Sequence, residues 1–504
     1  MNLSHSFSRA GVGIHAPLIT IETHLSNGLP CFAMVGMAEA AVRESKDRVR
    51  SALMNANLEF PTRRITVNLA PADLPKEGCR FDLPIALGIL AASGQLPMQQ
   101  LQGYEFVGEL ALSGELRPIR GVLPAALAAK KSDRVLVVPA ANAEEASLAG
   151  GKQLVAHHIL DVVAHLCGQQ ALPLNEHQNR QVVSSLPHDL KDVKGQHAAK
   201  RALELAAGGS HNLLFIGPPG TGKTMLASRL SGLLPELNDE EAVEVAAIAS
   251  VSGNEVAARN WKVRPFRVPH HTASAVALIG GGSIPRPGEV SLSHRGVLFL
   301  DELPEFDRKV LEVLREPLES GYVTISRAAR QAEYPAQFQL IAAMNPCPCG
   351  HFGNARGQCR CSSEQIRRYL LKLSGPFLDR IDMHIEVPLI AKEDFMRTTD
   401  QDAESSSAVR LRVEAAHQIQ YQRQGKLNAT LSAAELEKHI HIEPRANQFV
   451  LEAMEKLGLS ARAYHRILRV SRTIADLRQE EMVTMEAVAE AANYRKIERL
   501  LEQA

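Results

Sequence analysis

The stretch that decides the fold is Gly217-Pro218-Pro219-Gly220-Thr221-Gly222-Lys223-Thr224, which follows an apolar run and precedes a segment with a helical pattern. A phosphate-binding loop requires this order of strand, glycine-rich loop and helix. The glycines let backbone N–H groups turn inward around a polyphosphate without Cβ clashes. Lys223 can reach the terminal phosphates as a compact positive charge, and the Thr224 hydroxyl can bind the Mg²⁺ that accompanies them. An ordinary glycine-rich turn is the alternative.

A second apolar run, 297–300, ends in two acids, Asp301 and Glu302. A continuous hydrophobic run is typical of a buried parallel strand, and α/β folds bind ligands at the carboxyl ends of such strands. Asp301 can therefore hold Mg²⁺, while Glu302 can orient and polarise an attacking water molecule. Two helix-capping acids are the alternative interpretation.

Two further residues complete a candidate site. Asn345 follows the apolar run 340–344 and can bond a γ-phosphate or the attacking water; a turn asparagine is the alternative. Arg380 stands near a turn and can act on a neighbouring subunit's nucleotide as an arginine finger. A salt bridge to Asp379 or Asp382 is the alternative for Arg380.

Composition limits the class of protein. The chain has 504 residues, which predicts two to four domains with real cores. Its formal net charge is zero, so any contact with nucleic acid depends on local basic patches. Neither a signal peptide nor an apolar run of membrane-spanning length is present in the sequence, which predicts a cytoplasmic protein without membrane contact. Its seven cysteines favour a reducing compartment over a disulfide scaffold.

Residues 1–168 are predicted to form one mixed domain. Alternating patterns indicate strands over 18–23 and 64–69, and a helical pattern covers 39–55. Asp82 is predicted to cap another helix that runs to Gly94. Residues 169–188 are polar and aperiodic, which predicts a linker between this domain and an ATPase core over 189–395.

The first domain resembles Lon-type protease domains in segments 71–82 and 116–123. Arg80 stands where that family has its serine nucleophile, and Leu123 where it has its lysine base. Neither residue can take over that chemistry. The resemblance therefore implies a ribosomal-S5-like α+β domain without protease activity. Lys76, Arg80 and Arg120 form either a DNA-binding face or an ordinary solvated surface.

The ATPase core resembles the AAA+ ATPases, an α/β class with a C-terminal helical lid, here predicted over 396–504. The resemblance is closest to the magnesium-chelatase-like branch, and within it to the ComM/YifB family. Long matching segments carry it: 193–196, 211–224, 266–272, 285–306 and 345–350, with 65–87 in the first domain. It implies that Gln196 touches adenine, with simple helix entry as the alternative, and that Arg462 contacts the γ-phosphate, with Arg466 as second choice.

The same resemblance implies a homo-hexameric motor that uses ATP and Mg²⁺. It implies that the partner is DNA, single-stranded or branched, and that the activity is that of a helicase promoting branch migration during integration of incoming DNA in natural transformation and recombination. Two alternatives stay open. One is a chelatase subunit that drives Mg²⁺ insertion into a porphyrin, although the chain lacks a D-x-S-x-S motif. The other is a nucleotide-dependent assembly scaffold, which has no need of a water-activating acid such as Glu302.

Two loops are candidates for contact with DNA. A hairpin is predicted over 322–335, where Arg327 and Arg330 either contact DNA phosphates or lie on a solvated tip. A glycine-rich loop, 273–287, is its predicted companion. Before that loop, His270 and His271 are either buried for packing or sense its position.

Four cysteines cluster in the sequence. Cys347 and Cys349 precede a short glycine-bearing loop, and Cys359 and Cys361 follow it. Four thiolates in one loop can hold Zn²⁺ tetrahedrally, but the pairs have C-x-C spacing where C-x-x-C is commoner. The cluster is therefore either a zinc site or a set of reduced thiols.

Overall fold

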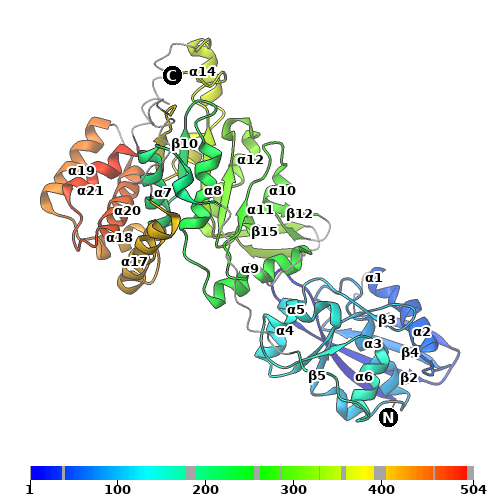
Figure 1. The fold of residues 1–504 in the computed structure, drawn as a ribbon. Coiled ribbons are helices and arrows are strands. Elements are labelled where there is room, and N and C mark those ends of the chain that lie inside the picture. The colour runs from blue at the N-terminus through cyan, green and yellow to red at the C-terminus, as the bar shows by residue number, and fades with distance from the viewer. Residues whose placement is uncertain are drawn as a thin grey trace.

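The computed structural model describes residues 2–36, 40–175, 188–254, 261–282, 285–327, 330–353, 359–390, 404–457 and 460–495. The ribbon shows an N-terminal domain, a central core and a C-terminal group of helices (Figure 1). The C-terminal helices cover the side of the core that faces away from the N-terminal domain (Figure 1).

The N-terminal domain contains a four-stranded sheet of order β1-β2-β4-β3. Its strands are β1 (Leu3–Arg9), β2 (Leu18–Ser26), β3 (Cys31–Val35) and β4 (Arg64–Ala70), which confirms the two predicted strands. Every residue of helix α3 (Asp82–Ala92) is buried, because the helix packs against β1 and β2. The other elements are β5 (Tyr104–Phe106), β6 (Glu109–Leu110), β7 (Leu116–Arg117), α4 (Val122–Lys131), β8 (Val135–Pro139), α5 (Ala143–Ser147), β9 (Gln153–Ala156) and α6 (Ile159–Leu166).

The helical segment predicted over 39–55 is divided into α1 (Ala40–Arg43) and α2 (Ser45–Asn55). The predicted cap at Asp82 is wrong, since Phe81 is the N-cap and makes no side-chain cap bond. The Asp82 carboxylate instead accepts hydrogen bonds from Arg48 Nε (2.8 Å) and the Leu110 N–H (3.3 Å). Burial raises the pKa of Asp82 to about 6, against the opposing effect of Arg48. A buried carboxylate needs such partners more than a helix end needs a cap.

The first part of the predicted linker packs on the N-terminal domain. The Val155 N–H donates to the Pro173 carbonyl (3.1 Å), and the Asn175 N–H donates to the Gln153 carbonyl (2.9 Å). Residues 176–187 of the predicted linker lie outside the described residues.

The core contains a five-stranded sheet of order β11-β14-β17-β10-β18, and all its neighbouring strands are parallel. The strands are β10 (Leu213–Ile216), β11 (Phe266–Arg267), β14 (Val297–Leu300), β17 (Gln339–Met344) and β18 (Met383–Glu386). Because β14, β17 and β10 are neighbours, the residues that follow them meet at one edge of the sheet. These are the acidic pair, Asn345 and the glycine-rich loop.

Helices and two hairpins surround this sheet. The helices are α7 (His197–Gly209), α8 (Lys223–Leu233), α9 (Asp239–Ser252), α10 (Ala275–Ile279), α11 (Glu289–Leu292), α12 (Arg308–Glu312), α13 (Arg315–Ser320), α14 (Ser363–Leu370) and α15 (Gly375–Leu378). The predicted hairpin is present as β15 (Tyr322–Arg327) and β16 (Arg330–Pro335). The predicted glycine-rich loop 273–287 instead contains α10 and a short ladder of β12 (Gly280–Gly281) with β13 (Arg286–Pro287).

The C-terminal helices are α17 (Ser406–Gln424), α18 (Ala433–His439), α19 (Pro444–Leu457), α20 (Ala461–Leu477) and α21 (Met485–Asn493). Gly425 ends α17 with φ 73°, a left-handed conformation that suits glycine. The sequence predicts a capping box from Ser432 and from Glu435 three residues later, and the structure confirms it at the start of α18.

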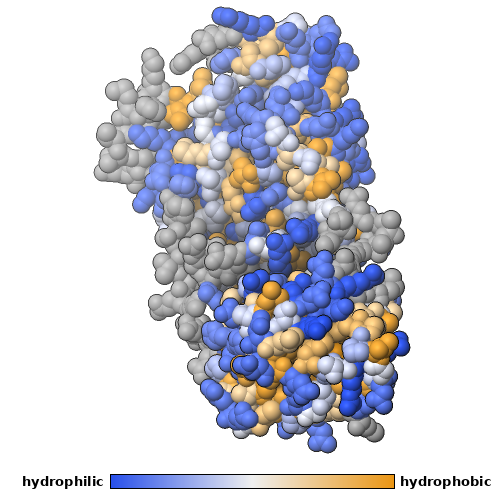
Figure 2. Space-filling model, turned by 90° about the vertical axis from the view of Figure 1, so that its right-hand side faces the viewer, coloured by the Kyte–Doolittle hydropathy of each residue, from blue (hydrophilic) through white to orange (hydrophobic). Residues whose placement is uncertain are grey.

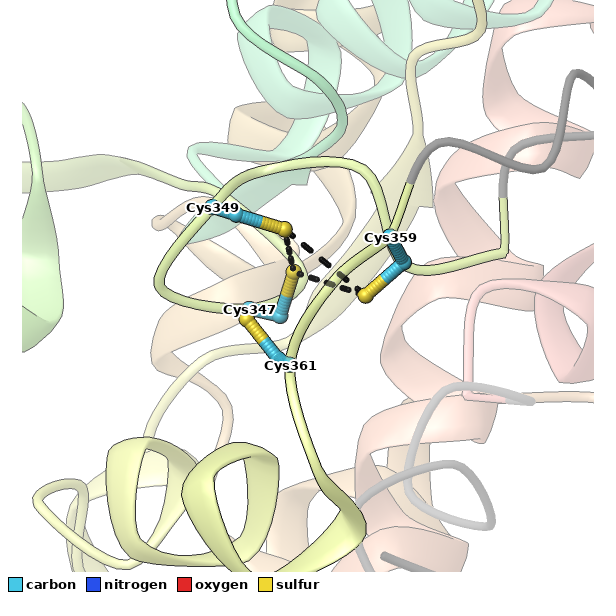
Figure 3. A group of neighbouring side chains, drawn as sticks. All are labelled: Cys347, Cys349, Cys359 and Cys361. Atoms are coloured by element: carbon cyan, nitrogen blue, oxygen red, sulfur yellow. Dashed lines mark hydrogen bonds between the residues drawn. The ribbon is translucent and has the colours of Figure 1, made fainter.

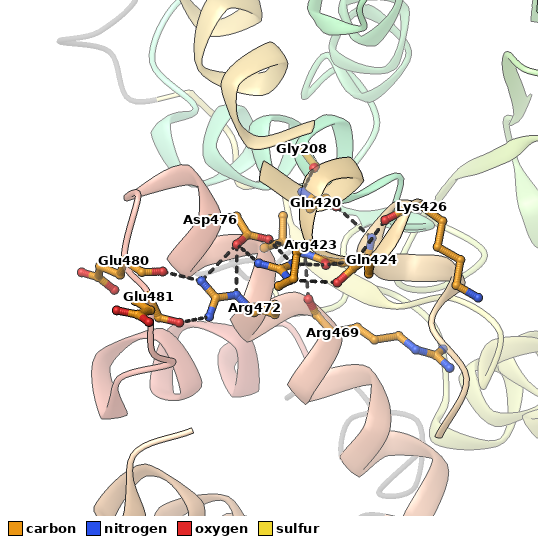
Figure 4. A network of polar contacts seen from close by, with 12 residues as sticks. Gly208, Gln420, Arg423, Gln424, Lys426, Arg469, Arg472, Asp476, Glu480 and Glu481 are labelled. Carbon is orange, nitrogen blue, oxygen red and sulfur yellow. Dashed lines mark hydrogen bonds and ion pairs between the residues drawn. The ribbon is translucent and has the colours of Figure 1, made fainter. Parts of the chain in front are cut away.

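A buried ion-pair network ties α17 to α20 (Figure 4). Asp476 is 1% exposed and accepts hydrogen bonds from Arg423 Nη1 (2.6 Å), Arg472 Nε (3.0 Å) and Asn428 Nδ2 (2.8 Å). Gln420 Nε2 on α17 donates to the Gly208 carbonyl at the end of α7 (2.7 Å). These contacts therefore hold α17 and α20 together and hold α17 against the core.

The described part of the chain contains no helix that is both long and apolar enough to span a bilayer. On the face drawn in Figure 2, polar residues alternate with small apolar patches over both the N-terminal domain and the core.

Candidate nucleotide-binding and hydrolysis site

The predicted phosphate-binding loop joins β10 to α8. Gly220 and Gly222 adopt φ values of 78° and 84°, which residues with a Cβ rarely adopt. A Cβ on Gly217 would stand 2.2 Å from the Val387 carbonyl oxygen, so the chain after β18 packs directly on the loop. Helix α8 begins at Lys223 without a side-chain cap bond, which leaves its first N–H groups available to a ligand.

Lys223 is held inside the loop. Its Nζ donates to the carbonyls of Gly217 (2.7 Å) and Pro218 (2.8 Å), and to Asn345 Oδ1 (3.1 Å). Burial lowers the pKa of Lys223, and the charge of Asp301 opposes this effect. The structure thus brings the loop lysine and the predicted asparagine together.

The oxygen atoms expected to hold Mg²⁺ also meet. Thr224 Oγ1 donates to Asp301 Oδ2 at 2.6 Å, in a position open to solvent. A hydroxyl and a carboxylate are ligands of the kind that Mg²⁺ prefers, and it commonly keeps waters and phosphate oxygens for its other positions. The residues present therefore fit a Mg²⁺ site beside the phosphate-binding loop.

Glu302 follows Asp301 in a strained conformation with φ 53°. Its carboxylate lies 3.2 Å from His271 Nδ1, and its side chain is 56% exposed. His270 instead bonds Thr272 (2.9 Å). The sequence alone does not show which of the two histidines contacts Glu302, because His271 and Glu302 are 31 positions apart in the chain. His271 is thus a site residue that sequence reasoning did not assign.

Gln196 lies beside the loop. It is the N-cap of α7 with φ 54°, and its Nε2 donates to the carbonyls of Pro388 (2.7 Å) and Thr221 (3.5 Å). Its predicted contact with adenine stays a prediction.

The two lid arginines differ in their surroundings. Arg462 on α20 has a side chain that is 66% exposed, with Nη1 4.0 Å from Asp379 Oδ2. Arg466, one turn later, forms an ion pair with the buried Asp382. Burial acts to raise the pKa of Asp382, but the charge of Arg466, the nearby His211 and the hydrogen bond from the Asn212 N–H outweigh burial and lower this pKa. Arg462 is therefore the arginine of the two that is available to a ligand.

Arg380 is engaged within its own chain. Its side chain is 9% exposed, with Nη2 2.5 Å from Glu319 Oε1 and Nη1 2.5 Å from the Pro376 carbonyl. The salt bridge weighed from the sequence therefore exists, but Glu319 at the end of α13 is its partner in place of Asp379 or Asp382. A role on a neighbouring subunit requires this pair to open.

The four clustered cysteines lie together in the loop after β17 (Figure 3). Their Sγ atoms all lie within 4.8 Å of one another, and Cys347 lies 3.4 Å from Cys349 and 3.8 Å from Cys359. Four thiolates about 2.3 Å from one Zn²⁺ stand roughly 3.8 Å apart, so this arrangement fits a tetrahedral zinc ion. A Cβ on Gly350 in this loop would stand 2.5 Å from Pro219, which places the cluster against the phosphate-binding loop.

For the two hairpin arginines, the structure describes the backbone alone. Arg327 and Arg330 are in register with each other at the adjoining ends of β15 and β16. Their side chains lie outside what the structure describes.

The segment similar to protease domains offers no nucleophile. Leu123 is buried in α4, and Arg80 lies directly before the helix cap at Phe81. Burial raises the pKa of the neighbouring Cys79 thiol to about 11, so this residue stays protonated at neutral pH.

The parallel sheet, the phosphate-binding loop and the Thr224–Asp301 pair define a P-loop ATPase core of the AAA+ class with a helical lid. A family model described as "Magnesium chelatase, subunit ChlI" matches residues 189–395. A model described as "Subunit ChlI of Mg-chelatase" matches residues 21–142, and one for the C-terminal part of that subunit matches residues 403–495.

Curated relatives match over the whole length. The competence protein ComM of Haemophilus influenzae is 55% identical over 100% of this chain and 99% of its own length. The uncharacterized protein YifB of Escherichia coli is 51% identical over 99% of this chain and 98% of its own length. The magnesium-chelatase 38 kDa subunit of Cereibacter sphaeroides is 27% identical over 32% of this chain and 53% of its own. The chain belongs to the ComM/YifB family of magnesium-chelatase-like AAA+ proteins.

Proposed function

We propose that the chain is an ATP-hydrolysing motor that moves DNA, acting as a homo-hexameric ring on single-stranded or branched substrates. In this proposal it promotes branch migration while incoming DNA is integrated during natural transformation. The observation that carries the proposal is the meeting of Lys223, Thr224, Asp301 and Asn345 at one sheet edge, with Glu302 held by His271. The similarity to a relative named as a competence protein supports the DNA-related setting.

The site residues have distinct roles in this proposal. Lys223 leaves its loop carbonyls to neutralise the terminal phosphates, and the oxygens of Thr224 and Asp301 hold Mg²⁺. Bound Mg²⁺ would supply positive charge against the phosphate oxygens. Glu302 accepts a proton from the attacking water, and Asn345 orients that water or the γ-phosphate. Charge that develops on the phosphate is stabilised by Arg462 from the lid and Arg380 from the neighbouring subunit.

A chelatase subunit is the second candidate. The descriptions of the matching family models favour it, but the chelatase relative quoted above covers 32% of this chain. A scaffold that only binds nucleotide would not need the Glu302–His271 pair. One assay separates the three functions: the rate of ATP hydrolysis with and without single-stranded or branched DNA. Strong stimulation by DNA supports the motor, and an unchanged rate argues against it.

The hairpin β15–β16 is proposed to grip DNA in the ring pore. Changing both Arg327 and Arg330 to alanine should weaken DNA binding and flatten its salt dependence, because each phosphate contact releases counterions. Basal ATP hydrolysis should persist, since neither residue belongs to the nucleotide site. Fluorescence anisotropy with a labelled oligonucleotide measures the effect. Arg368→Ala, which removes an exposed arginine on α14, is the matched control. Unchanged DNA affinity in the double variant would remove the hairpin from the mechanism.

The cysteine cluster is proposed to hold one Zn²⁺, which fixes the loop that follows Asn345. Purified protein should contain about one equivalent of zinc, and Cys359→Ser should lose most of it because three thiolates bind zinc more weakly than four. Elemental analysis measures the metal content. Cys167→Ser changes an exposed cysteine outside the cluster and should leave the metal content unchanged. Folded protein with well below one equivalent of zinc would contradict the proposal.

A further inference from the structure

A cavity of about 830 Å³ lies between the N-terminal domain and the ATPase core. The N-terminal domain lines it with Arg80 and Arg120, and the core lines it with Arg286 of β13 and Tyr334 of β16. None of the residues assigned above to the nucleotide site lines this cavity. On the side of the N-terminal domain, the cavity is lined by the two segments that resemble a protease site. The nucleotide site described above does not use these segments.

Close contacts between the two domains define the cavity. The Gly121 N–H donates to the Ser250 carbonyl at the end of α9 (3.2 Å). A Cβ on Gly13 would stand 2.9 Å from the Glu333 carbonyl oxygen of β16. Helix α4 packs against α9 next to these contacts (Figure 1). The cavity therefore lies in an open cleft between the two domains, and a ligand in it would touch both.

Arg80 has unused hydrogen-bonding capacity in this cavity. Its Nη2 donates to the Arg120 carbonyl (2.7 Å), while its Nη1 is buried and has no hydrogen-bond partner. Among the residues that the structure describes, no acid forms an ion pair with Arg80, Arg120 or Arg286. Burial lowers the pKa of Arg80 to about 10, so the side chain still carries its charge at neutral pH.

Two of the three acids that line the cavity interact with groups other than these arginines. Asp73, Glu77 and Glu109 belong to the lining. Glu109 lies 3.6 Å from Arg117, and the charge of Asp73 acts on Lys76. Lys76 itself is buried and donates to the Pro71 carbonyl, so it is not part of the basic face considered from the sequence.

A guanidinium nitrogen that is buried without a hydrogen-bond partner is energetically costly. The planar fork of an arginine matches phosphate oxygens, and several arginines around one cavity favour a multiply charged anion. We propose that the cavity between the two domains binds a phosphate group, with Arg80 and Arg120 as its ligands and Arg286 contributing from the core. The phosphate belongs either to a free nucleotide or to a DNA backbone, and a cavity of this volume accommodates either.

The test uses the full chain carrying Lys223→Ala, which removes phosphate binding by the glycine-rich loop. Three probes are titrated: inorganic phosphate, ATP, and a single-stranded oligonucleotide without terminal phosphates. A ligand that binds the folded state raises the unfolding temperature in a saturable manner. Adding Arg80→Gln should weaken binding of at least one probe tenfold or more. Adding Arg63→Gln removes an exposed arginine of the same domain outside the cavity and should change nothing.

The three probes identify the source of the phosphate. Loss of only the oligonucleotide response points to a DNA backbone, and loss of the ATP or phosphate response points to a free nucleotide. Should Arg80→Gln prevent folding, Arg120→Gln takes its place because that side chain is exposed. The proposal is overturned if no probe binds the Lys223→Ala chain, or if the arginine variants bind every probe as tightly as that chain does. Neither result would affect the motor proposal, which is tested by hydrolysis in the unmodified chain.

Discussion

Replacing Glu302 with glutamine should lower the rate of ATP hydrolysis by about 10²- to 10⁴-fold, the usual contribution of a general base. ATP should still bind, because glutamine has nearly the same shape and Lys223, Thr224 and Asp301 remain in place. Steady-state hydrolysis and equilibrium binding of a fluorescent ATP analogue measure the two quantities separately. Wild-type hydrolysis by the glutamine variant would remove Glu302 from the mechanism.

Replacing His271 tests whether its contact positions Glu302. Its Nδ1 lies 3.2 Å from the Glu302 carboxylate, and the strained backbone of Glu302 makes this contact a means of holding the side chain in place. A partly exposed ion pair contributes about 0.2–1 kcal/mol, so His271→Ala should slow hydrolysis by up to roughly fivefold. His271→Asn, which keeps a hydrogen-bond donor, should recover part of the rate. Equal rates in all three proteins would show that the contact does not position Glu302.

Replacing Arg380 with alanine should reduce hydrolysis by about 10³-fold or more, as expected of an arginine finger. The defect should be repaired in part by mixing Arg380→Ala subunits with Glu302→Gln subunits. Some interfaces in mixed rings then combine an intact Glu302 from one subunit with an intact Arg380 from its neighbour. Hydrolysis by the mixture, compared with each variant alone, measures this complementation.

The Arg380–Glu319 ion pair makes the result informative. If Arg380 only stabilises its own chain, Arg380→Ala and Glu319→Gln should both lower the unfolding temperature, and mixing should restore nothing. If Arg380 acts across the interface, it must leave Glu319, whose side chain is 60% exposed and can turn into solvent. Glu319→Gln should then keep hydrolysis at or above the wild-type rate. A mixture no more active than its components would contradict the finger role.

The local sequence predicted the helix ends correctly where a rule that spans only a few residues determines them. Gly425 ends α17, and Ser432 with Glu435 caps α18, because both devices are complete within a few residues. The cap predicted at Asp82 failed because the competing partner, Arg48, comes from another helix. In the glycine-rich loop 273–287, helix α10 was missed because its five residues are too few to show a period.

The sequence by itself determined the phosphate-binding loop, the acidic pair and Asn345, because each stands directly after an apolar strand. Because these strands pair in parallel, the residues that follow them lie at one common edge of the sheet. Only the tertiary structure decided which histidine holds Glu302, that Arg380 is bound to Glu319, and that Arg80 lines a cavity between two domains. These contacts join residues 31 or more positions apart, or residues on separate domains. Their partners are chosen by packing and burial in three dimensions, which no local pattern encodes.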